Sequence, residues 1–571
     1  MVNGSSRPWW QTGVVYQIYP RSFADGNGDG IGDLRGATDQ LDYLEWLGID
    51  AIWLSPHFPS PQADFGYDVA DYMDVEPEYG TLGDFQQFLN EAHDRGIRVL
   101  LDLVLNHTSN QHPWFIESRS SADNPRHDWY MWHPGTVAAD GSRVPPNNWL
   151  SAFGGPGWTW DEVRGEWYYH YFLAQQPDLN WRNPDVATAM WDVVRFWLDR
   201  GVDGFRLDAI ATLFETEGLG DHGADFSLIE LWNSRYERNA RLDAIPHWET
   251  MFGGQLHQPE VHDVLRRLRC VVDEYEDRVL VGESDRLEYC GPDQLQMVFN
   301  FPLTRMEQLT AEAIRDNQRA RLAEMPAGAW PCNTMGNHDT HRARSRLADG
   351  VNDEGLATVA AALTLLLPGT PSLYQGEEIG MEDYLTTDPA TLLDPIGRWF
   401  YHAAVEELGM DPAAAARRAA RFSRDRTRTP MQWSSGANAG FSPEGVETWL
   451  PVHPNHRTGV NVADQRIDAS SILAFYQRLI HFRRDHVALR EGGYEEAQPN
   501  SDEVYAFVRP HPAERLLVAI NLGPHPAALS IGPHHILWSG DAPVVAAVTE
   551  DELVVAGFGL AIAEIADTAA G

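Results

Sequence analysis

Eight short apolar segments recur along most of the chain, and they constrain the fold more than any other feature. Apolar residues fill both faces of each segment, which is typical of strands buried in a parallel sheet. Helical patterns at 41–47 and 85–94 separate the first of these segments. Eight strand–helix units predict an α/β fold, a closed (β/α)₈ TIM barrel rather than an open sheet. The expected strands are 14–20, 49–56, 98–107, 202–210, 278–284, 296–301, 330–339 and 370–378.

Two long stretches interrupt this alternation, and a third stretch follows it. Residues 108–181 are rich in Trp, Tyr, Pro, Gly and Asn and too long for an ordinary loop, so we expect an inserted subdomain after strand three. Beyond about residue 484, short alternating segments separated by Pro and Gly predict a C-terminal antiparallel β-sandwich. The expected parts are the first part of the catalytic barrel at 1–107, subdomain B at 108–181, the second part of the barrel at 182–484 with a long insertion at 379–459 after strand eight, and the sandwich at 485–571.

The charge balance excludes several classes of partner. With 43 Lys and Arg against 83 Asp and Glu, the 571-residue chain has a formal net charge of −40. Such a chain repels nucleic acids and anionic membranes, whereas its negative charge neither attracts nor repels a neutral substrate. Three cysteines without metal-ligand spacing predict neither a disulfide scaffold nor a metal cluster. Because no leader-like or membrane-spanning segment is visible, we expect a cytoplasmic monomer or homodimer with no organic cofactor.

Acidic residues stand where three of the expected strands end. In such a barrel the reactive groups lie at the C-terminal ends of the strands, so Asp208, Glu283 and Asp339 converge on one mouth. Two carboxyls with different pKa values are what glycoside hydrolysis needs. Arg206 shares a strand face with Asp208 and can keep it ionised, whereas Glu283 has no cation two residues away in either direction. We therefore expect Glu283 to keep a raised pKa, as a general acid requires.

Four ordered segments then resemble the motifs of the α-amylase family of glycoside hydrolases, family 13. They are DLVLNH at 102–107, GFRLD at 204–208, VGE at 281–283 and GNHD at 336–339. The resemblance implies the barrel, an inserted domain after strand three and a C-terminal β-sandwich. It also implies these roles: Asp208 as nucleophile, Glu283 as acid/base, Asp339 as transition-state stabiliser, Asp68, His107, Arg206 and His338 around the −1 sugar, and Tyr67 as the platform beneath it.

Two further segments, QPDLN at 176–180 and RTPMQW at 428–433, resemble the oligo-1,6-glucosidase and α-glucosidase subgroup of that family. In this subgroup an arginine near the second segment reaches the −1 sugar, and either Arg424 or Arg428 fits. The subgroup usually has Val directly after the nucleophile in α-1,6-specific members and small or hydroxylated residues in α-1,4-specific ones. Ala209 at this position favours α-1,4 bonds, although it can equally be a packing choice.

A metal site is also expected in the first strand–helix loop. Oxygen-bearing residues alternate with glycine from 25 to 33, a pattern that suits Ca²⁺, with Mg²⁺ as the alternative ion. An unmetallated Asx-rich turn gives the same composition. The subgroup carries Ca²⁺ in this loop, which implies a structural ion. The expected ligands are Asp25, Asn27, Asp29, Ile31 and Asp33.

The sequence thus predicts a retaining, exo-acting α-glucosidase that hydrolyses terminal α-1,4-linked glucose from maltose and short oligosaccharides through a covalent β-glucosyl-Asp208 intermediate. Three alternatives stay open. One is a transglucosylase or a glucosyl isomerase such as trehalose synthase, with the same first step. Another is an α-1,6-preferring glucosidase, and the last is a non-catalytic partner of a membrane transporter. The stretch 210–277 and the pair Thr340–His341 match no single activity.

Overall fold

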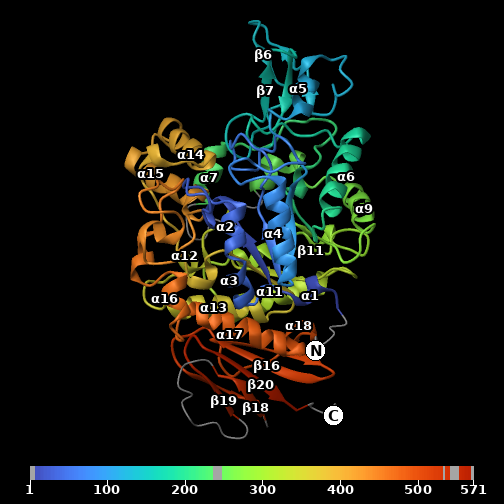
Figure 1. Ribbon diagram of the computed structural model, residues 1–571. Helices are drawn as coiled ribbons and strands as arrows, with labels where there is room; N and C mark the ends of the chain where they lie inside the picture. Colours follow the sequence, from blue (N-terminus) through green and yellow to red (C-terminus); the bar gives the residue numbers. More distant parts are fainter. Residues whose placement is uncertain (1–6, 236–246, 532–533, 540–551, 567–571) are drawn as a thin grey trace.

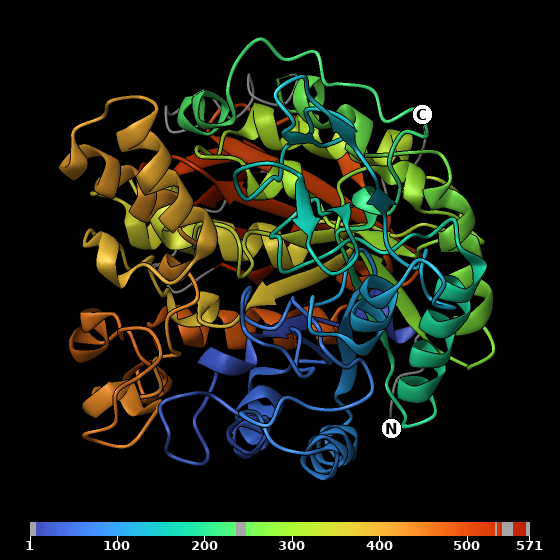
Figure 2. The same ribbon diagram turned by 90° about the horizontal axis from the view of Figure 1, so that it is seen from above.

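Eight parallel strands form the centre of the molecule (Figures 1 and 2). The computed structural model describes residues 7–235, 247–531, 534–539 and 552–566. The strand order is β11-β10-β9-β3-β2-β1-β13-β12, and a bridge between Phe299 and Cys332 joins the two ends. The sheet therefore closes, which confirms the predicted barrel. The strands are β1 (Val15–Ile18), β2 (Ala51–Leu54), β3 (Arg98–Val104), β9 (Gly204–Asp208), β10 (Val279–Gly282), β11 (Met297–Val298), β12 (Cys332–Thr334) and β13 (Thr370–Tyr374).

Each expected strand is present but shorter than its apolar segment. The segment at 330–339 contributes only β12 to the sheet, and its last five residues run on as a loop above the barrel. Side chains such as Trp53, Leu100 and Val281 fill the interior, while a larger apolar core lies between the strands and the outer helices. Apolar residues on both strand faces were the signal for this two-sided burial.

The helices pack around the outside of the barrel, and their starts follow local sequence. Thr81 and Asp84 form a capping box at α4, and Asn183 and Thr310 cap α6 and α11 through their side chains. Between β10 and β11 there is only a 3₁₀ turn, Leu287–Tyr289. The helices of the barrel are α1 (Trp9–Thr12), α2 (Leu34–Asp39), α3 (Leu41–Leu47), α4 (Leu82–Asp94), α6 (Pro184–Leu198), α7 (Leu228–Ser234), α9 (Val261–Val272), α10 (Phe301–Thr304), α11 (Ala311–Glu324), α12 (Ala343–Leu347), α13 (Asp353–Leu366) and α17 (Ile472–Asp485).

Subdomain B is inserted after β3 and projects from the top of the barrel in Figure 1. It contains α5 (Pro113–Ser120), a sheet of β4 (Trp132–His133), β8 (Glu166–Tyr169) and β7 (Trp158–Asp161), and a hairpin of β5 (Thr136–Val137) and β6 (Arg143–Val144). Antiparallel bridges between His107 and Asp178 and between Tyr130 and Leu179 join the outgoing and returning chain. The base of the insertion is therefore fixed next to the end of β3.

The long segment after β13 forms a second lobe beside the barrel mouth. Its helices α14 (Pro395–Glu406) and α15 (Pro412–Phe422) begin at Asp-Pro pairs and pack against each other through an apolar cluster that includes Phe400. The chain then passes through short 3₁₀ turns and α16 (Val462–Arg466) before it returns to α17. This lobe and subdomain B flank the opening of the barrel (Figures 1 and 2).

The C-terminal part is a two-layer antiparallel structure below the barrel, as predicted. A five-stranded sheet in the order β14-β15-β16-β20-β18 packs on the pair β17 and β19 around Val504, Leu529 and Leu553. Its other face joins the main core, next to α17 and α18 (Val487–Glu491). The strands are β14 (Glu495–Glu496), β15 (Val504–His511), β16 (Glu514–Asn521), β17 (Ala527–Ser530), β18 (His534–Trp538), β19 (Glu552–Val555) and β20 (Leu560–Ile565).

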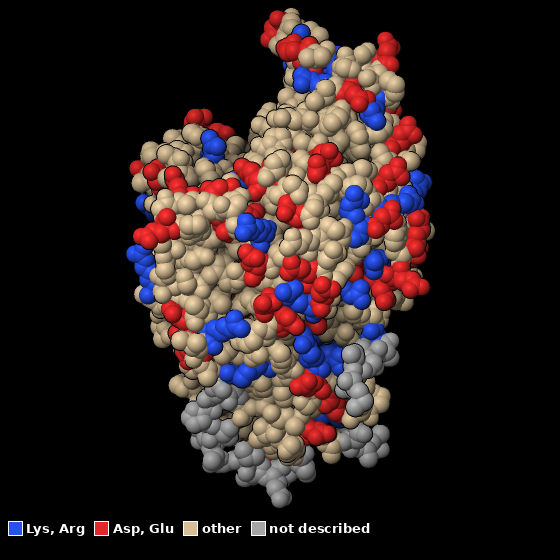
Figure 3. Space-filling model, viewed as in Figure 1, with Lys and Arg blue, Asp and Glu red and all other residues tan. Residues whose placement is uncertain are grey.

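The surface carries its acidic groups in a scattered pattern. In the face shown in Figure 3, Asp and Glu are spread between tan residues and do not gather in one patch. Among the described residues, no helix is long and apolar enough to cross a membrane.

Candidate active site

The register of three adjacent strands brings four charged residues together. In the pairing of β3 with β9, Asp102 lies opposite Arg206, and in the pairing of β10 with β9, Val281 lies opposite Arg206. Glu283 follows two residues later, and its backbone N–H donates to Leu207 O at 2.9 Å. Glu283 is therefore level with Asp208 at the end of β9. Because parallel strands end at the same edge of a barrel, these side chains share its mouth.

One guanidinium group holds all three of these carboxyls. Arg206 Nη1 donates to Asp102 Oδ1 at 2.8 Å and to Asp208 Oδ1 at 2.6 Å, and Nη2 lies 3.0 Å from Glu283 Oε2. The Arg206 side chain is only 2% exposed, whereas Glu283 is 27% exposed and faces the pocket. The cation beside Glu283 thus comes from the neighbouring strand. This corrects the expectation, drawn from positions along one strand, that no cation lies near Glu283.

Asp208 and Glu283, the two carboxyls expected to react, both have a raised pKa. Burial raises the pKa of Glu283 to about 8, and burial raises the pKa of Asp208 to about 7, with Arg206 opposing the rise in both. A raised pKa is what the expected role of Glu283 as acid/base requires. The physical cause differs from the one expected. Arg206 does not distinguish the two groups, since it contacts both.

Ala209 contacts the acid through its backbone. Its N–H donates to Glu283 Oε2 at 2.9 Å, and its φ of 47° places it in the left-handed region. Non-glycine residues adopt this conformation rarely, and β-branched residues adopt it at the highest cost. The residue after Asp208 therefore helps to position Glu283. Spacing along the sequence carries no signal for this backbone contact.

Asp339 is surrounded by cations rather than by other acids. Arg428 Nη2 donates to its Oδ1 at 2.5 Å, and Arg424 Nη1 lies 3.6 Å from the same oxygen. Burial alone raises the pKa of Asp339, but the charges of Arg428 and Arg424 hold that pKa well below its usual range. Both arginines expected as alternatives therefore contact one carboxylate, which is ionised at every pH of interest.

An aromatic pair lies on the wall between these clusters. Tyr67 and His338 stack with ring centroids 5.4 Å apart, and the Tyr67 hydroxyl lies 2.5 Å from His338 Nε2. Gln17 Nε2 is 2.8 Å from the other ring nitrogen, Nδ1. His338 is fully buried, and burial lowers its pKa well below the usual value, so the ring is neutral. Gln17, which the sequence did not single out, thus fixes the orientation of this histidine.

Asp68 does not line the pocket, which corrects its expected place at the −1 sugar. Its carboxylate accepts hydrogen bonds from Ser60 Oγ and from the backbone N–H groups of Ala63 and Asp64, so it stabilises the loop after β2. Asp64 lines the pocket instead and accepts from Arg424 Nη2 at 2.6 Å. Both aspartates lie in one irregular loop, where no periodic pattern shows which of them points inward.

His107 lies at the base of subdomain B and also lines the pocket. Gln176 Nε2 is 3.0 Å from His107 Nε2 and donates to Asp64 Oδ2 at 3.1 Å. Burial lowers the pKa of His107 to about 3, so this ring is neutral as well. Gln176 belongs to the QPDLN segment noted in the sequence, which was the available signal for its role.

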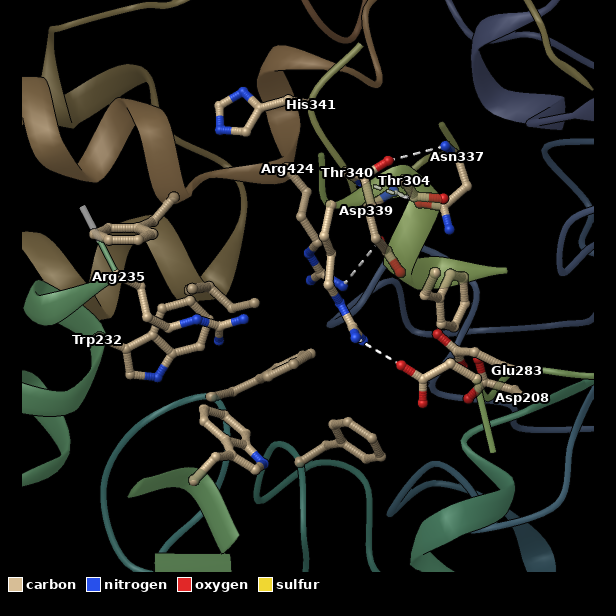
Figure 4. A pocket seen from close by; sticks show the side chains of 18 of the residues that line it. Asp208, Trp232, Arg235, Glu283, Thr304, Asn337, Asp339, Thr340, His341 and Arg424 are labelled. Carbon is tan, nitrogen blue, oxygen red and sulfur yellow. Dashed lines mark hydrogen bonds and ion pairs between the residues drawn. The ribbon is translucent and has the colours of Figure 1, made fainter. Parts of the chain in front are cut away.

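One pocket of about 1010 Å³ is lined by Asp64, Tyr67, His107, Asp208, Glu283, Asp339 and Arg424, whereas Arg206, His338 and Arg428 lie behind its wall and contact these residues. Figure 4 shows Asp208 and Glu283 on one side of the cavity, Arg424 and Asp339 between, and Trp232 and Arg235 on the far side. The inner part is polar, and the outer part mixes aromatic and charged side chains. The outer lining includes Phe153, Tyr171, Phe172, Trp232, Arg235, Trp248, His257, Arg286, Phe301, Arg305, His341, Arg421, Phe422 and Arg426.

The loop at 25–33 lies away from this pocket and holds its carboxylates with backbone amides. Asp25 Oδ2 accepts from Gly30 N at 2.8 Å, Asp29 Oδ1 from Ile31 N at 2.9 Å, and Asp33 Oδ2 from Asn27 N at 2.9 Å. In the part of the chain that the structure describes, no three His, Cys, Asp or Glu side chains come together as metal ligands. The expected ion there stays a prediction.

Comparison with known proteins assigns the family. A profile described as "Alpha amylase, catalytic domain" matches residues 17–492. The "Probable alpha-glucosidase" of Rhizobium meliloti (strain 1021) is 42% identical over 530 residues, 90% of each chain. The oligo-1,6-glucosidase of Parageobacillus thermoglucosidasius is 37% identical over 574 residues, 96% of each chain. The crystal structure of the alpha-glucosyl transfer enzyme XgtA has a TM-score of 0.85 at 39% identity, covering 98% of this chain and 100% of that one. This chain therefore belongs to the α-amylase family and is a glycoside hydrolase.

Proposed function

We propose that the enzyme is a retaining, exo-acting α-glucosidase that releases terminal glucose from short saccharides through a covalent β-glucosyl-Asp208 intermediate. The observation that carries this proposal is the contact of Arg206 with both Asp208 and Glu283. Two carboxyls on one guanidinium group are close together. This favours the separation of about 5 Å found in retaining enzymes over the wider spacing of inverting ones.

In the first step, Glu283 donates its proton to the glycosidic oxygen as the bond to the anomeric carbon breaks. Asp208 then forms a bond to that carbon from the opposite face. Positive charge develops on the sugar ring in the transition state, and the ionised Asp339 lies in the same pocket to stabilise it. In the second step Glu283, now a carboxylate, takes a proton from water, and the oxygen of that water displaces Asp208.

The ion pair of Asp64 and Arg424 supports action on terminal units. Arg424 Nη2 donates to Asp64 Oδ1 and also to Asp394 Oδ1, each at 2.6 Å, so it ties the loop after β2 to the segment after β13. Arg424 Nη1 also approaches Asp339. This bridge beside Asp339 restricts the inner pocket to a single sugar.

The type of glycosidic bond that is cleaved and the acceptor of the glucosyl unit are the more detailed parts of the proposal. Ala209 supports α-1,4 bonds, while the relative named oligo-1,6-glucosidase supports the α-1,6 alternative. The likeness to an alpha-glucosyl transfer enzyme supports transfer to a second sugar as an alternative to hydrolysis.

A panel of maltose, isomaltose, trehalose, sucrose and maltotriose, with products identified by chromatography and NMR, tests these points together. We expect mainly glucose from maltose, released first as the α-anomer. Trehalose or longer products would favour transfer, an isomaltose preference would favour α-1,6 bonds, and initial β-glucose would exclude retention.

We also propose that the loop at 25–33 binds a structural Ca²⁺ ion through oxygen atoms of Asp25, Asn27, Asp29, Ile31 and Asp33. The oxygen-only donor set fits a hard cation. The loop is also anchored to the segment after β13, because Trp449 N donates to Gly30 O at 3.1 Å. We expect EDTA to lower Tm by a few degrees and Ca²⁺ to restore it better than Mg²⁺, whereas an unchanged Tm would leave the loop an ordinary turn.

A further inference from the structure

Arg321 is a buried cation that contacts the loop after β10, and the mechanism above does not use it. It lies on α11 and is only 8% exposed. Its guanidinium group donates to three backbone carbonyl oxygens, through Nη1 to Asp285 O at 2.6 Å and through Nη2 to Val298 O at 3.4 Å and Phe299 O at 3.3 Å. Arg321 therefore ties the loop after β10 to the end of β11.

This loop carries Glu283 and has no α-helix of its own. Glu283 directly follows β10, and Asp285, two residues further on, lines the same pocket. The described residues between β10 and β11 contain only the 3₁₀ turn Leu287–Tyr289, whereas most strands of a (β/α)₈ barrel are followed by an outer helix. Helix α11 comes after the next strand, β11, and Arg321 is the side chain through which it reaches back to the loop.

Two arginines hold Asp285, one through its backbone and one through its side chain. Its carbonyl oxygen accepts from Arg321, and its Oδ2 accepts from Arg305 Nη1 at 2.6 Å. The Arg305 side chain is 41% exposed, whereas Arg321 is buried. A hydrogen bond from a charged donor is stronger where water is excluded than where solvent competes for it. The contact with Arg321 is therefore the one that fixes the path of the backbone just beyond Glu283.

The position of the Glu283 carboxyl group depends on that path. Two groups contact the carboxyl itself, Arg206 Nη2 at 3.0 Å and the backbone N–H of Ala209 at 2.9 Å, and both come from β9 or the residue after it. A general acid must lie within hydrogen-bonding reach of the oxygen that it protonates, so a small displacement of its backbone lowers the rate strongly.

We propose that Arg321 is a positioning residue for the acid/base. By holding Asp285 O, it fixes the backbone from which the Glu283 side chain reaches the glycosidic oxygen. Arg321 acts through the loop, because it lies behind the residues that line the pocket. This inference rests on the proposed α-glucosidase function.

The test compares two substrates that share the terminal glucose but differ in their need for an acid. A sugar leaving group needs a proton, whereas 4-nitrophenolate leaves without one. For Arg321→Met, we expect kcat/KM to fall on the order of 10-fold with the best disaccharide of the panel, and less than about threefold with 4-nitrophenyl α-glucoside. With the aryl substrate kcat and KM should fall together, because the second step still needs Glu283 as a base. Arg321→Lys, whose ammonium group can still donate to Asp285 O, should recover most of the disaccharide activity.

Arg509 in β15 provides the matched control. It is fully buried as well, and it also donates to three backbone carbonyl oxygens, those of Leu366, Gly492 and Gly493. Arg509→Met removes the same kind of contact far from Glu283 along the chain. It should lower Tm and leave the ratio of the two kcat/KM values unchanged.

An equal loss with both substrates, or no loss with either, would overturn the proposal. A change of the ratio in Arg509→Met as large as that in Arg321→Met would overturn it too. If Arg321→Met does not fold, Arg321→Gln is judged by the same ratio. Failure of the α-glucosidase function itself looks different, because the wild-type enzyme would then turn over neither substrate, or Glu283→Gln would show no dependence on the leaving group.

Discussion

Two arginine-centred clusters lie in one pocket and treat their carboxyls in opposite ways. Arg206 alone serves Asp102, Asp208 and Glu283, whereas Arg428 and Arg424 both approach Asp339. The arginines are buried in both clusters, while Glu283 and Asp339 are each about a third exposed or less, at 27% and 33%. In the first, burial outweighs the single cation and raises the pKa values, and in the second, the cations outweigh burial. The ratio of cations to acids therefore decides which carboxyl can carry a proton.

This difference matches the charge that the proposed reaction requires on each carboxyl group. A proton donor must hold a proton near neutral pH, and a stabiliser of positive charge must never hold one. Substitutions of single residues in each cluster test this difference.

The largest effect is expected for Asp208→Asn. An amide cannot form the glycosyl ester, so kcat should fall on the order of 10⁴-fold with both saccharide and aryl substrates. Stopped assays with 4-nitrophenyl α-glucoside and an unchanged thermal unfolding curve would provide the check. Near-wild-type turnover by this variant would remove Asp208 from the role of nucleophile.

Arg206→Met is expected to have the second largest effect on activity. Without the Arg206 cation that contacts all three carboxyls, these groups take up protons, Asp208 is neutral at pH 7, and kcat/KM should fall on the order of 10³-fold. The acid limb of the pH–rate profile should move to higher pH in this variant. An acid limb that stays in place would show that Arg206 does not govern the ionisation of Asp208.

Arg428→Met should lower kcat/KM less than Arg206→Met does, on the order of 10-fold to 100-fold. Asp339 keeps Arg424 nearby and remains ionised, so position is disturbed more than charge. Parallel pH–rate profiles for wild type and this variant test the point. A loss as large as that of Arg206→Met would mean that the two clusters do not differ in redundancy.

The pH–rate profile of the wild-type enzyme involves the smallest expected effect, and it compares Asp208 and Glu283 directly. In the proposed mechanism the active form has Asp208 ionised and Glu283 protonated. With pKa values of about 7 and about 8, kcat/KM should fall as pH drops below about 7 and as it rises above about 8, tenfold per pH unit on each side. Glu283→Gln should abolish the alkaline limb with an aryl substrate, and an alkaline limb that persists would assign that limb to another group.

Much of this site was predictable because it follows strand ends. Asp208 ends β9, Glu283 directly follows β10, and Asp339 lies in the loop that continues from β12, and a closed barrel brings such positions together whatever their distance along the chain. The environment of Glu283 was not predictable in the same way. Its cation comes from an adjacent strand, and the pairing register that brings Arg206 next to it is not written in the spacing of either strand.

Loops are the second place where the sequence does not predict the positions of side chains. Asp64 and Asp68 are four residues apart in a segment without helix or strand, so only the folded path shows that Asp64 reaches the pocket and Asp68 does not. Arg424 and Arg428 are likewise four apart and both approach Asp339, but Arg424 lines the pocket and the fully buried Arg428 does not. The sequence motifs therefore identified the segments that form the site. Which side chains of those segments point into the pocket is known only from the structure.

The bridges at the base of subdomain B have a consequence for how such enzymes diverge. Because His107 pairs with Asp178 where the insertion leaves and rejoins the barrel, the excursion is closed at its neck. Its tip can be lengthened, shortened or exchanged without altering the barrel. The neck has no such freedom, since His107 and Gln176 there also line or brace the pocket. Evolution can therefore reshape the entrance to this site while the chamber behind it is inherited nearly unchanged.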